Sequence, residues 1–329
     1  MIKRTLGKFA ALAAVFTAAV GFAAPAFAQA DFPNQPIKWI VPYPPGGGTD
    51  IFARTLADSM KNTLGQQLII DNRPGASTNI AAEYVTKSKA DGYTIMSGDN
   101  AAMAFNEHLF KKLPYSPAKD FTYIGAIGRW PLVLVVHPSV PAKTVKEFLD
   151  YVAANPGKVD YASPGNGSPH HMGMEIFKQR TGAKLTHIPY KGAAPALQDL
   201  VGGQVPSMFL DLASGLGLMK AGKVRMLAIA APNRAAIFPD VPTMAEAGIK
   251  DMEAYAFQGL LGPAGLPPAV VTKLNAALNA ALKDPAVVGK FNDFGTEITG
   301  GTPDAFLKYA RSEATRWGPV IKNSGIQLD

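Results

Sequence analysis

The chain has 329 residues, no cysteine, 17% charged residues and a formal net charge of +7. The lack of cysteine excludes disulfides, thiolate metal sites, cysteine nucleophiles and a lipid-modified cysteine tether. Lys and Arg are scattered among acidic residues rather than gathered in runs, so the sequence has no footprint of nucleic-acid binding. A chain of this length exceeds what one hydrophobic core usually holds, which predicts two lobes.

The N-terminus has the three parts of a secretory signal peptide. Lys3, Arg4 and Lys8 precede an apolar run at about 9–22, and the small-residue triplet Ala26-Phe27-Ala28 follows. The apolar run is shorter than the roughly 20 residues of a membrane-spanning helix, so we expect cleavage after Ala28. Cleavage removes three basic residues and no acidic one, which lowers the net charge from +7 to +4. We expect the mature chain to be a monomer, free in the periplasm and not anchored to the membrane.

Short β-rich runs alternate with helical stretches along the first part of the chain. The pattern predicts strands at 37–41, 67–71 and 93–97 and helices at 51–62, 80–87 and 100–111. Two strand-like runs follow at 121–127 and 132–137, and Pro131 separates them. Alternation of this kind predicts a parallel sheet flanked by helices.

The second part of the chain repeats the alternation. It predicts helices at 145–154, 170–180, 195–201 and 213–221 and strands at 159–162, 184–188, 207–210 and 224–230. The chain then crosses back near 254–261 and ends in helices at 268–282, 285–294 and 303–323. We therefore expect an α/β fold of two lobes, each a sheet flanked by helices. Lobe 1 is discontinuous, with residues 29–130 plus 255–329, and lobe 2 holds 131–254. Two crossing segments at the hinge let such lobes close like a clamshell.

The most informative loop has the sequence YPPGGGTD at 43–50, between a buried strand and a helix. Its three glycines let the backbone turn tightly and direct N–H groups outward. Thr49 or Asp50 can cap a helix that begins at Ile51. A helix start of this kind binds anions. A tight turn with an ordinary cap is the alternative interpretation, and this loop alone leaves both open.

Three further loops lie at strand-to-helix junctions, at 72–79 in lobe 1 and at 163–170 and 189–195 in lobe 2. Ligands of open α/β sheets bind at the carboxyl ends of the strands, so helix N-termini from both lobes can face one cleft. Asp211 follows a strand and can accept a hydrogen bond from a ligand hydroxyl or amine. The candidate ligand-binding residues are Tyr43, Gly46, Gly47, Gly48, Thr49, Asp50, Ala76, Ser77, Asn79, Ser163, Gly165, Asn166, Gly167, Ser168, His170 and Asp211.

Five motifs in chain order resemble the substrate-binding proteins of tripartite tricarboxylate transporters, also called the Bordetella uptake gene, or Bug, family. They are PYPPGGGTD, NRPGASTN, ADGYTI, SPGNGSPH and IPYKGAAPALQDLVGGQV, beginning at residues 42, 72, 90, 163 and 188. The resemblance implies a Venus-flytrap fold that holds a carboxylate with backbone amides, small hydroxyl side chains and bridging water. It also implies delivery to a transporter with one large and one small membrane subunit. The family's ligands are mostly di- and tricarboxylates, acidic amino acids and aromatic carboxylates.

Two positions depart from the family's pattern. Pro206 stands where many relatives carry Asp, which can alter the strand leading to Asp211. Phe257 stands where relatives often carry Trp, which can reshape the hinge or the cleft wall. Two facing anion sites suit two carboxylates, so a dicarboxylate of small to moderate length is the favoured ligand, and an aromatic carboxylate is the alternative. Trp130 can wall the pocket or simply pack, and we favour packing.

The sequence offers no catalytic constellation, so we expect a receptor without cofactor or metal rather than an enzyme. The segment at 217–224 lacks the Ser or Thr of a phosphate loop, and Pro117 spoils a Ser-x-x-Lys motif. His170 and His171 point about 100° apart on a helix, a poor arrangement for sharing a metal. His170 either donates to a bound anion or caps its helix. The less favoured alternatives are a periplasmic α/β hydrolase and a receptor that serves a signalling kinase.

Overall fold

The computed structural model describes residues 32–329, so the predicted signal peptide at 1–28 lies outside the described residues. Its strands form one continuous sheet in the order β2-β1-β3-β9-β4-β7-β5-β6, and β8 and β10 also pair with β4. The strands are β1 (Ile37–Val41), β2 (Leu68–Asn72), β3 (Thr94–Asp99), β4 (Phe121–Val136), β5 (Asp160–Ser163), β6 (Thr186–Pro189), β7 (Ser207–Asp211), β8 (Arg225–Ile229), β9 (Tyr255–Pro263) and β10 (Glu297–Ile298).

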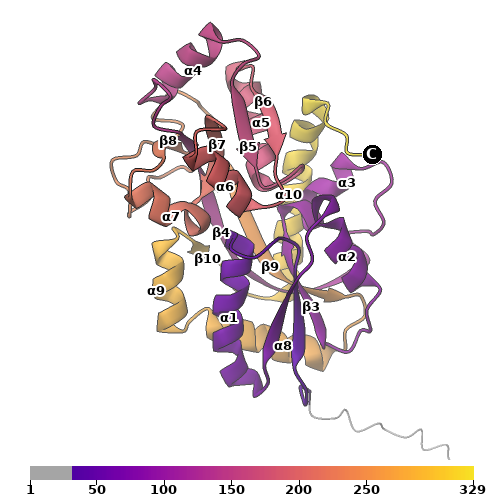
Figure 1. Cartoon of the computed structure of the whole chain (residues 1–329). Coiled ribbons are helices and arrows are strands. Elements are labelled where there is room, and N and C mark those ends of the chain that lie inside the picture. Colours follow the sequence, from indigo (N-terminus) through magenta and orange to yellow (C-terminus); the bar gives the residue numbers. More distant parts are fainter. Residues whose placement is uncertain (1–31) are drawn as a thin grey trace, which may run out of the picture.

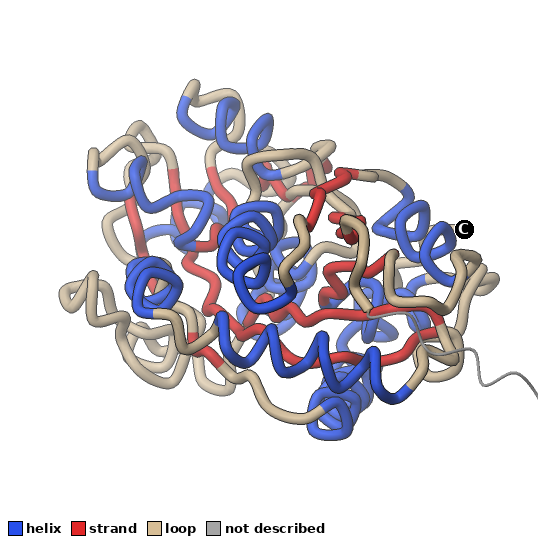
Figure 2. Tube along the Cα trace, turned by 90° about the horizontal axis from the view of Figure 1, so that it is seen from below, coloured by secondary structure: helices blue, strands red, loops and turns tan. Residues whose placement is uncertain are grey.

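Helices connect these strands and cover the sheet. They are α1 (Gly48–Leu64), η1 (Ala76–Thr78), α2 (Asn79–Thr86), η2 (Ala101–Phe105), α3 (Asn106–Leu109), α4 (Val145–Ala154), α5 (Pro169–Thr181), α6 (Ala193–Val201), α7 (Leu212–Lys220), α8 (Pro268–Ala281), α9 (Pro285–Asp293) and α10 (Pro303–Ser324). Seen from below in Figure 2, the helices lie on both sides of the strands. Among the described residues, no helix is long and apolar enough to cross a bilayer.

The molecule has two halves joined by long strands. Figure 1 shows one half around α1, α2, β3 and α8, the other around α4, α5, α6 and α7, and the strands β4 and β9 between them. The first part of β4 pairs with β9 as far as Pro131 opposite Tyr255, and from Leu132 onward it pairs with β7 and β8. The fold is therefore the expected α/β arrangement of two lobes, each a sheet flanked by helices.

Two expectations about the sheet are wrong. The sheet is mixed rather than parallel, because β9 runs antiparallel to β3 and β4, and β4 runs antiparallel to β7. The two strand-like runs around Pro131 form one 16-residue strand. Proline cannot donate a ladder hydrogen bond, but Pro131 lies where β4 changes partners from β9 to β7 and β8. The strand therefore continues through the proline.

Apolar side chains at helical spacing hold α1 in place. Phe52, Leu56 and Met60, each four residues after the last, are fully buried and point into the core.

On the strands, close packing depends on small residues. A Cβ at Gly259 of β9 would lie 2.0 Å from the Phe306 ring of α10, so only glycine lets this helix lie so close to the sheet. This packing fixes the strand ends from which the site is built.

Candidate functional site

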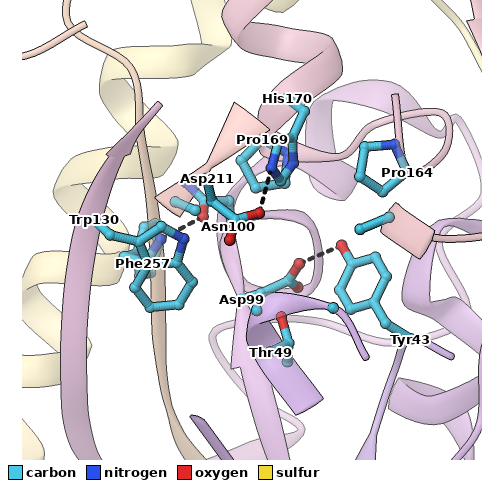
Figure 3. A pocket seen from close by; sticks show the side chains of 14 residues that line it. Tyr43, Thr49, Asp99, Asn100, Trp130, Pro164, Pro169, His170, Asp211 and Phe257 are labelled. Atoms are coloured by element: carbon cyan, nitrogen blue, oxygen red, sulfur yellow. Dashed lines mark hydrogen bonds and ion pairs between the residues drawn. The ribbon is translucent and has the colours of Figure 1, made fainter. Parts of the chain in front are cut away.

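A pocket lies between the two halves of the molecule, and we call it the central pocket. It is narrow and partly open to solvent. Figure 3 shows side chains from both halves around it. The lining residues are Tyr43, Gly47, Gly48, Thr49, Asp99, Asn100, Trp130, Pro164, Pro169, His170, Ala193, Asp211, Ala256 and Phe257.

The N-termini of four helices meet at this pocket. Gly48 begins α1, Pro169 begins α5 and Ala193 begins α6, while Asp211 is the residue just before α7. The first amides of a helix have no partner within the helix and carry a partial positive charge. Thr49 is in this position, and its amide makes no hydrogen bond to another described residue. The pocket is thus an environment that favours an anion.

Two hydrogen bonds join the two halves of the molecule near the pocket. The amide of Gly48 donates to the hydroxyl of Ser214 across the gap at 3.0 Å. The Ser77 hydroxyl donates to the carbonyl of Asn166 at 2.8 Å. Ser77 lies in a run of three non-glycine residues with left-handed φ, 46° to 74°, a conformation that is uncommon for such residues. The Gly48–Ser214 and Ser77–Asn166 hydrogen bonds define a closed arrangement of the lobes.

On the lobe 1 side, Asp99 is the last residue of β3 and is only 3% exposed. Its carboxylate accepts a hydrogen bond from the hydroxyl of Tyr43 at 2.6 Å and one from the amide of Ala102 at 3.0 Å. Burial raises the pKa of Asp99 despite these donors. Burial and the Asp99 carboxylate raise the pKa of Tyr43, which keeps its hydroxyl protonated as a donor.

On the lobe 2 side, Asp211 and His170 form a buried pair. His170 Nε2 lies 3.0 Å from the Asp211 carboxylate, and the amide and hydroxyl of Ser214 also donate to that carboxylate. Burial alone would raise the pKa of Asp211, but the hydrogen bond and charge of His170 and the Ser214 donors bring it below the ordinary value. Asp211 therefore caps α7 and holds His170 in position.

The side wall of the pocket is aromatic and belongs to the crossing strands. Trp130 stacks on Phe52 with ring centroids 4.3 Å apart, and it also lines the pocket. The packing that we favoured for Trp130 and the alternative of a pocket wall are both present. Phe257 lines the pocket as well, and its amide donates to the side-chain oxygen of Asn100 at 2.8 Å. Asn100 thereby ties the end of β3 to β9.

The structure divides the sixteen candidate site residues into three groups. Six of them line the central pocket, namely Tyr43, Gly47, Gly48, Thr49, His170 and Asp211. A second group lies in an outer groove that shares Tyr43 and Pro164 with the central pocket, and it consists of Ala76, Ser77, Gly165, Asn166 and Ser168. The remaining candidates line neither of these two hollows, and they are Gly46, Asp50, Asn79, Ser163 and Gly167.

The predicted cap of α1 is wrong. The helix begins at Gly48 rather than Ile51, and the residue before it, Gly47, makes no side-chain cap. Asp50 lies within the first turn and accepts hydrogen bonds from the Gly46 amide and from Arg54 and Asn72. Burial would raise the pKa of Asp50, but these donors, Arg54 first, lower it. Asp50 thus fixes the glycine-rich loop from behind.

Neutral histidines support the lobe 2 loop at 163–170. His171 accepts a hydrogen bond from the Gly167 amide at 3.0 Å, and its ring stacks on His187 with centroids 3.8 Å apart. His187 Nε2 in turn lies 2.7 Å from the Ser163 hydroxyl. Burial lowers the pKa of each histidine to about 3. Ser163 and Gly167 therefore shape the loop rather than line the pocket. The described residues contain no group of three or more His, Cys, Asp or Glu side chains that could hold a metal ion.

Sequence reasoning missed Asp99 and Asn100. Asp99 ends β3 and Asn100 follows it. The carboxyl ends of β1 and β3 meet at the same edge of the sheet because these strands are parallel neighbours. The rule that singled out the loop after the first strand applies equally to this one. The available signal was the polar pair Asp99 and Asn100, which comes shortly after the strand predicted at 93–97.

Comparison with known proteins agrees with this geometry. A family model described as "Tripartite tricarboxylate transporter family receptor" matches residues 52–326. Protein BugT of Bordetella pertussis is 37% identical over 319 residues, which cover 97% of this chain and 98% of BugT.

Solved structures of similar sequence have the same fold. The R. palustris protein Rpa4515 with adipate superposes with a TM-score of 0.87 at 36% identity, covering 90% of this chain and 99% of that one. The periplasmic binding protein BugD superposes with a TM-score of 0.86 at 32% identity, covering 90% and 99%. The resemblance inferred from five sequence motifs is confirmed, and the chain belongs to the receptor family of tripartite tricarboxylate transporters.

Proposed function

We propose that this chain is a periplasmic receptor that captures a small carboxylate between its lobes and delivers it to a membrane transporter. The transporter is of the tripartite tricarboxylate type, with one large and one small membrane subunit. The observation that carries this proposal is the convergence of helix N-termini from both lobes on the central pocket. Each N-terminus is equivalent to roughly half a positive charge.

Backbone groups are well suited to hold the carboxylate. At the start of α1, the Thr49 amide has no partner among the described residues, and Gly47, two residues earlier, has no side chain to keep a ligand from the backbone. His170, at the start of α5, faces the same pocket from lobe 2. A carboxylate that contacts both starts bridges the two lobes and stabilises the closed arrangement over the open one.

Dicarboxylates of small to moderate length are the first ligands to test. The relative Rpa4515 was solved with adipate, a dicarboxylate, and facing helix starts suit an elongated anion. Aromatic carboxylates are the second class, because Trp130 and Phe257 present ring surface to the pocket. Rings of this kind bury the apolar body of a ligand while amides fix its polar end.

We also propose where the hinge between the lobes lies and in which compartment the protein acts. We place the hinge in β4 at Pro131 and in the chain just before Tyr255, so that lobe 1 holds residues 29–130 and 255–329 and lobe 2 holds 131–254. Opening at this hinge gives the ligand access to the pocket. The signal peptide predicted at 1–28 exports a monomer that is free in the periplasm. The receptor releases its ligand unchanged.

A thermal-shift screen of the mature chain tests this function. The panel contains di- and tricarboxylates, aromatic acids and acidic amino acids, and hits are measured by isothermal titration calorimetry. A ligand at 100 times its dissociation constant stabilises the folded state by about 2.7 kcal/mol, which gives a clear rise in melting temperature. Silence across the whole panel would contradict the proposal. Mass spectrometry of the recovered ligand separates a receptor from a hydrolase, since only a hydrolase converts it.

A further inference from the structure

Among residues 32–329, no cationic side chain forms an ion pair with Asp99. Its donors are the Tyr43 hydroxyl and the backbone amides at the start of the following helix, Ala102 first, and all of them are neutral. Among the described residues that line the central pocket, none is Lys or Arg. His170 also lines the pocket, but its Nε2 lies 3.0 Å from the Asp211 carboxylate, so any charge that it carries is balanced there. Asp99 therefore faces the pocket as an uncompensated acid.

Capping of the following helix does not account for this arrangement. Asp99 accepts one hydrogen bond on each carboxylate oxygen, from Ala102 on Oδ1 and from Tyr43 on Oδ2. Each carboxylate oxygen has about two acceptor positions, so both oxygens retain acceptor capacity. A neutral Asn would cap equally well without the cost of burying a charge.

The opposite wall of the pocket also holds a polar atom without a partner. Figure 3 shows Asp99 with Tyr43 on one side of the pocket and Asp211 with His170 on the other. His170 Nδ1 is buried and has no hydrogen-bond partner, and the whole residue is only 7% exposed. When Nε2 carries the proton that binds Asp211, Nδ1 is an acceptor. In that tautomer the pocket offers the ligand two side-chain acceptors, Asp99 from lobe 1 and His170 Nδ1 from lobe 2.

We propose that Asp99 is a specificity-determining residue that accepts a hydrogen bond from an ammonium or hydroxyl group on the ligand. This proposal rests on the proposed function, in which the helix starts hold one carboxylate. Among the small carboxylates of the proposed function, it ranks those with a donor group at the other end above the dicarboxylates that are tested first. An ammonium group fits best, because it also neutralises Asp99. A second carboxylate in that place meets an acid of the same charge.

The test is a matched ligand series. Each compound has one carboxylate, a methylene spacer and an end group X, where X is ammonium, hydroxyl or carboxylate, and several spacer lengths are measured by titration calorimetry. At the spacer length that binds best, we expect ammonium to bind roughly 10- to 100-fold more tightly than carboxylate, in the range of a charge-assisted hydrogen bond. Hydroxyl is expected between them, and its rank distinguishes hydrogen bonding from charge.

Asp99→Asn assigns the effect to this residue. The variant keeps an acceptor for Ala102 and removes the charge, so the preference for ammonium over carboxylate should fall to within about threefold. Tyr43→Phe is the second variant, because it keeps the charge of Asp99 and should therefore keep the preference. Asp50→Asn is the matched control. Asp50 is equally buried in lobe 1 but already pairs with Arg54 and lies outside the pocket lining, so its loss should change all ligands in the same proportion.

The outcomes separate this proposal from the function on which it rests. If dicarboxylates bind as tightly as the ammonium compounds, and Asp99→Asn leaves that ratio unchanged, the role of Asp99 is refuted while the receptor function stands. If no carboxylate in the screen or the series binds, both are refuted. If Asp99→Asn does not fold, a Tyr43→Phe protein that prefers carboxylate over ammonium still overturns the proposal.

Discussion

Replacing Gly48 with alanine tests whether lobe 2 closes onto the start of α1. In the structure, an added Cβ at Gly48 would lie 2.9 Å from Asp211 Oδ1 and 3.6 Å from Ala213 Cβ. Asp211 cannot easily move away, because His170 and both donors of Ser214 hold it. The methyl group therefore obstructs the approach of lobe 2 to α1. In an open arrangement it meets no such obstacle.

The magnitude follows from two separate losses. Overpacking of a tight contact typically costs about 1–3 kcal/mol. The displaced Gly48 amide also loses its hydrogen bond to Ser214, a loss of about 1 kcal/mol. Together these make closure about 2–4 kcal/mol less favourable, which weakens ligand affinity by roughly 30-fold or more. Alanine at a helix position is up to about 1 kcal/mol better than glycine, so the unliganded fold is not expected to lose stability.

Titration calorimetry of the tightest ligand measures the effect. The control is Gly289→Ala, in which glycine is also replaced within a helix but the added Cβ meets nothing within 4 Å. We expect Gly48→Ala to lose affinity and keep its melting temperature, while Gly289→Ala keeps both. Unchanged affinity in Gly48→Ala would refute closure onto this residue. An equal loss in Gly289→Ala would show that the effect is not local.

Three further predictions concern pH and the lobe contact. Burial lowers the pKa of His171 from 6.5 to about 3, so the unfolded chain takes up the proton at a higher pH than the folded chain. The free energy of unfolding therefore falls as pH drops below about 6.5, by about 2 kcal/mol at pH 5. In calorimetry, His171→Asn, whose amide oxygen can still accept from Gly167, should flatten this decline, and an unchanged slope counts against it. Since burial raises the pKa of Asp99, its ionisation destabilises the fold as pH rises. Asp99→Asn should therefore gain more melting temperature over wild type at pH 8 than at pH 4, and an equal gain would contradict this. Ser77→Ala loses the hydrogen bond to Asn166 and should weaken ligand binding by about 1 kcal/mol. The melting temperature of the unliganded protein should not change. A fall in both ligand affinity and melting temperature would indicate a structural role for Ser77 instead.

Elements with strong local signals were predictable from the sequence. The helix expected at 145–154 has those bounds in the structure. Thr144 accepts from the Glu147 amide, and the Glu147 carboxylate accepts from the Lys143 amide. This reciprocal arrangement fixes the first residue of a helix from within its own sequence. Boundaries of this kind need no information from the rest of the fold.

Strand direction and partner were not predictable in the same way. The antiparallel pairing of β9 with β3 and β4 joins segments more than 100 residues apart in the chain, and no local pattern encodes it. Pro131 breaks a strand in most contexts. Here the change of partners at that residue removes the conflict. Tertiary structure thus overrides the local signal.

The site was predictable at the level of loops but not of side chains. The glycine-rich loop and His170 were expected at the pocket and lie there. Asp50 and Ser163 belong to the same motifs, yet their side chains turn to Arg54 and His187 behind the loops. Which way a side chain in a turn points depends on partners from distant elements. The sequence motif names the loop, and only the fold decides which of its residues reach the ligand.

A crystal structure of the mature chain with its tightest carboxylate tests the central claim most directly. We predict closed lobes, with carboxylate oxygens about 2.7–3.2 Å from backbone amides at the start of α1 and in contact with the start of α5. A carboxylate bound outside the central pocket, or held by Lys or Arg side chains with the lobes apart, would contradict the account.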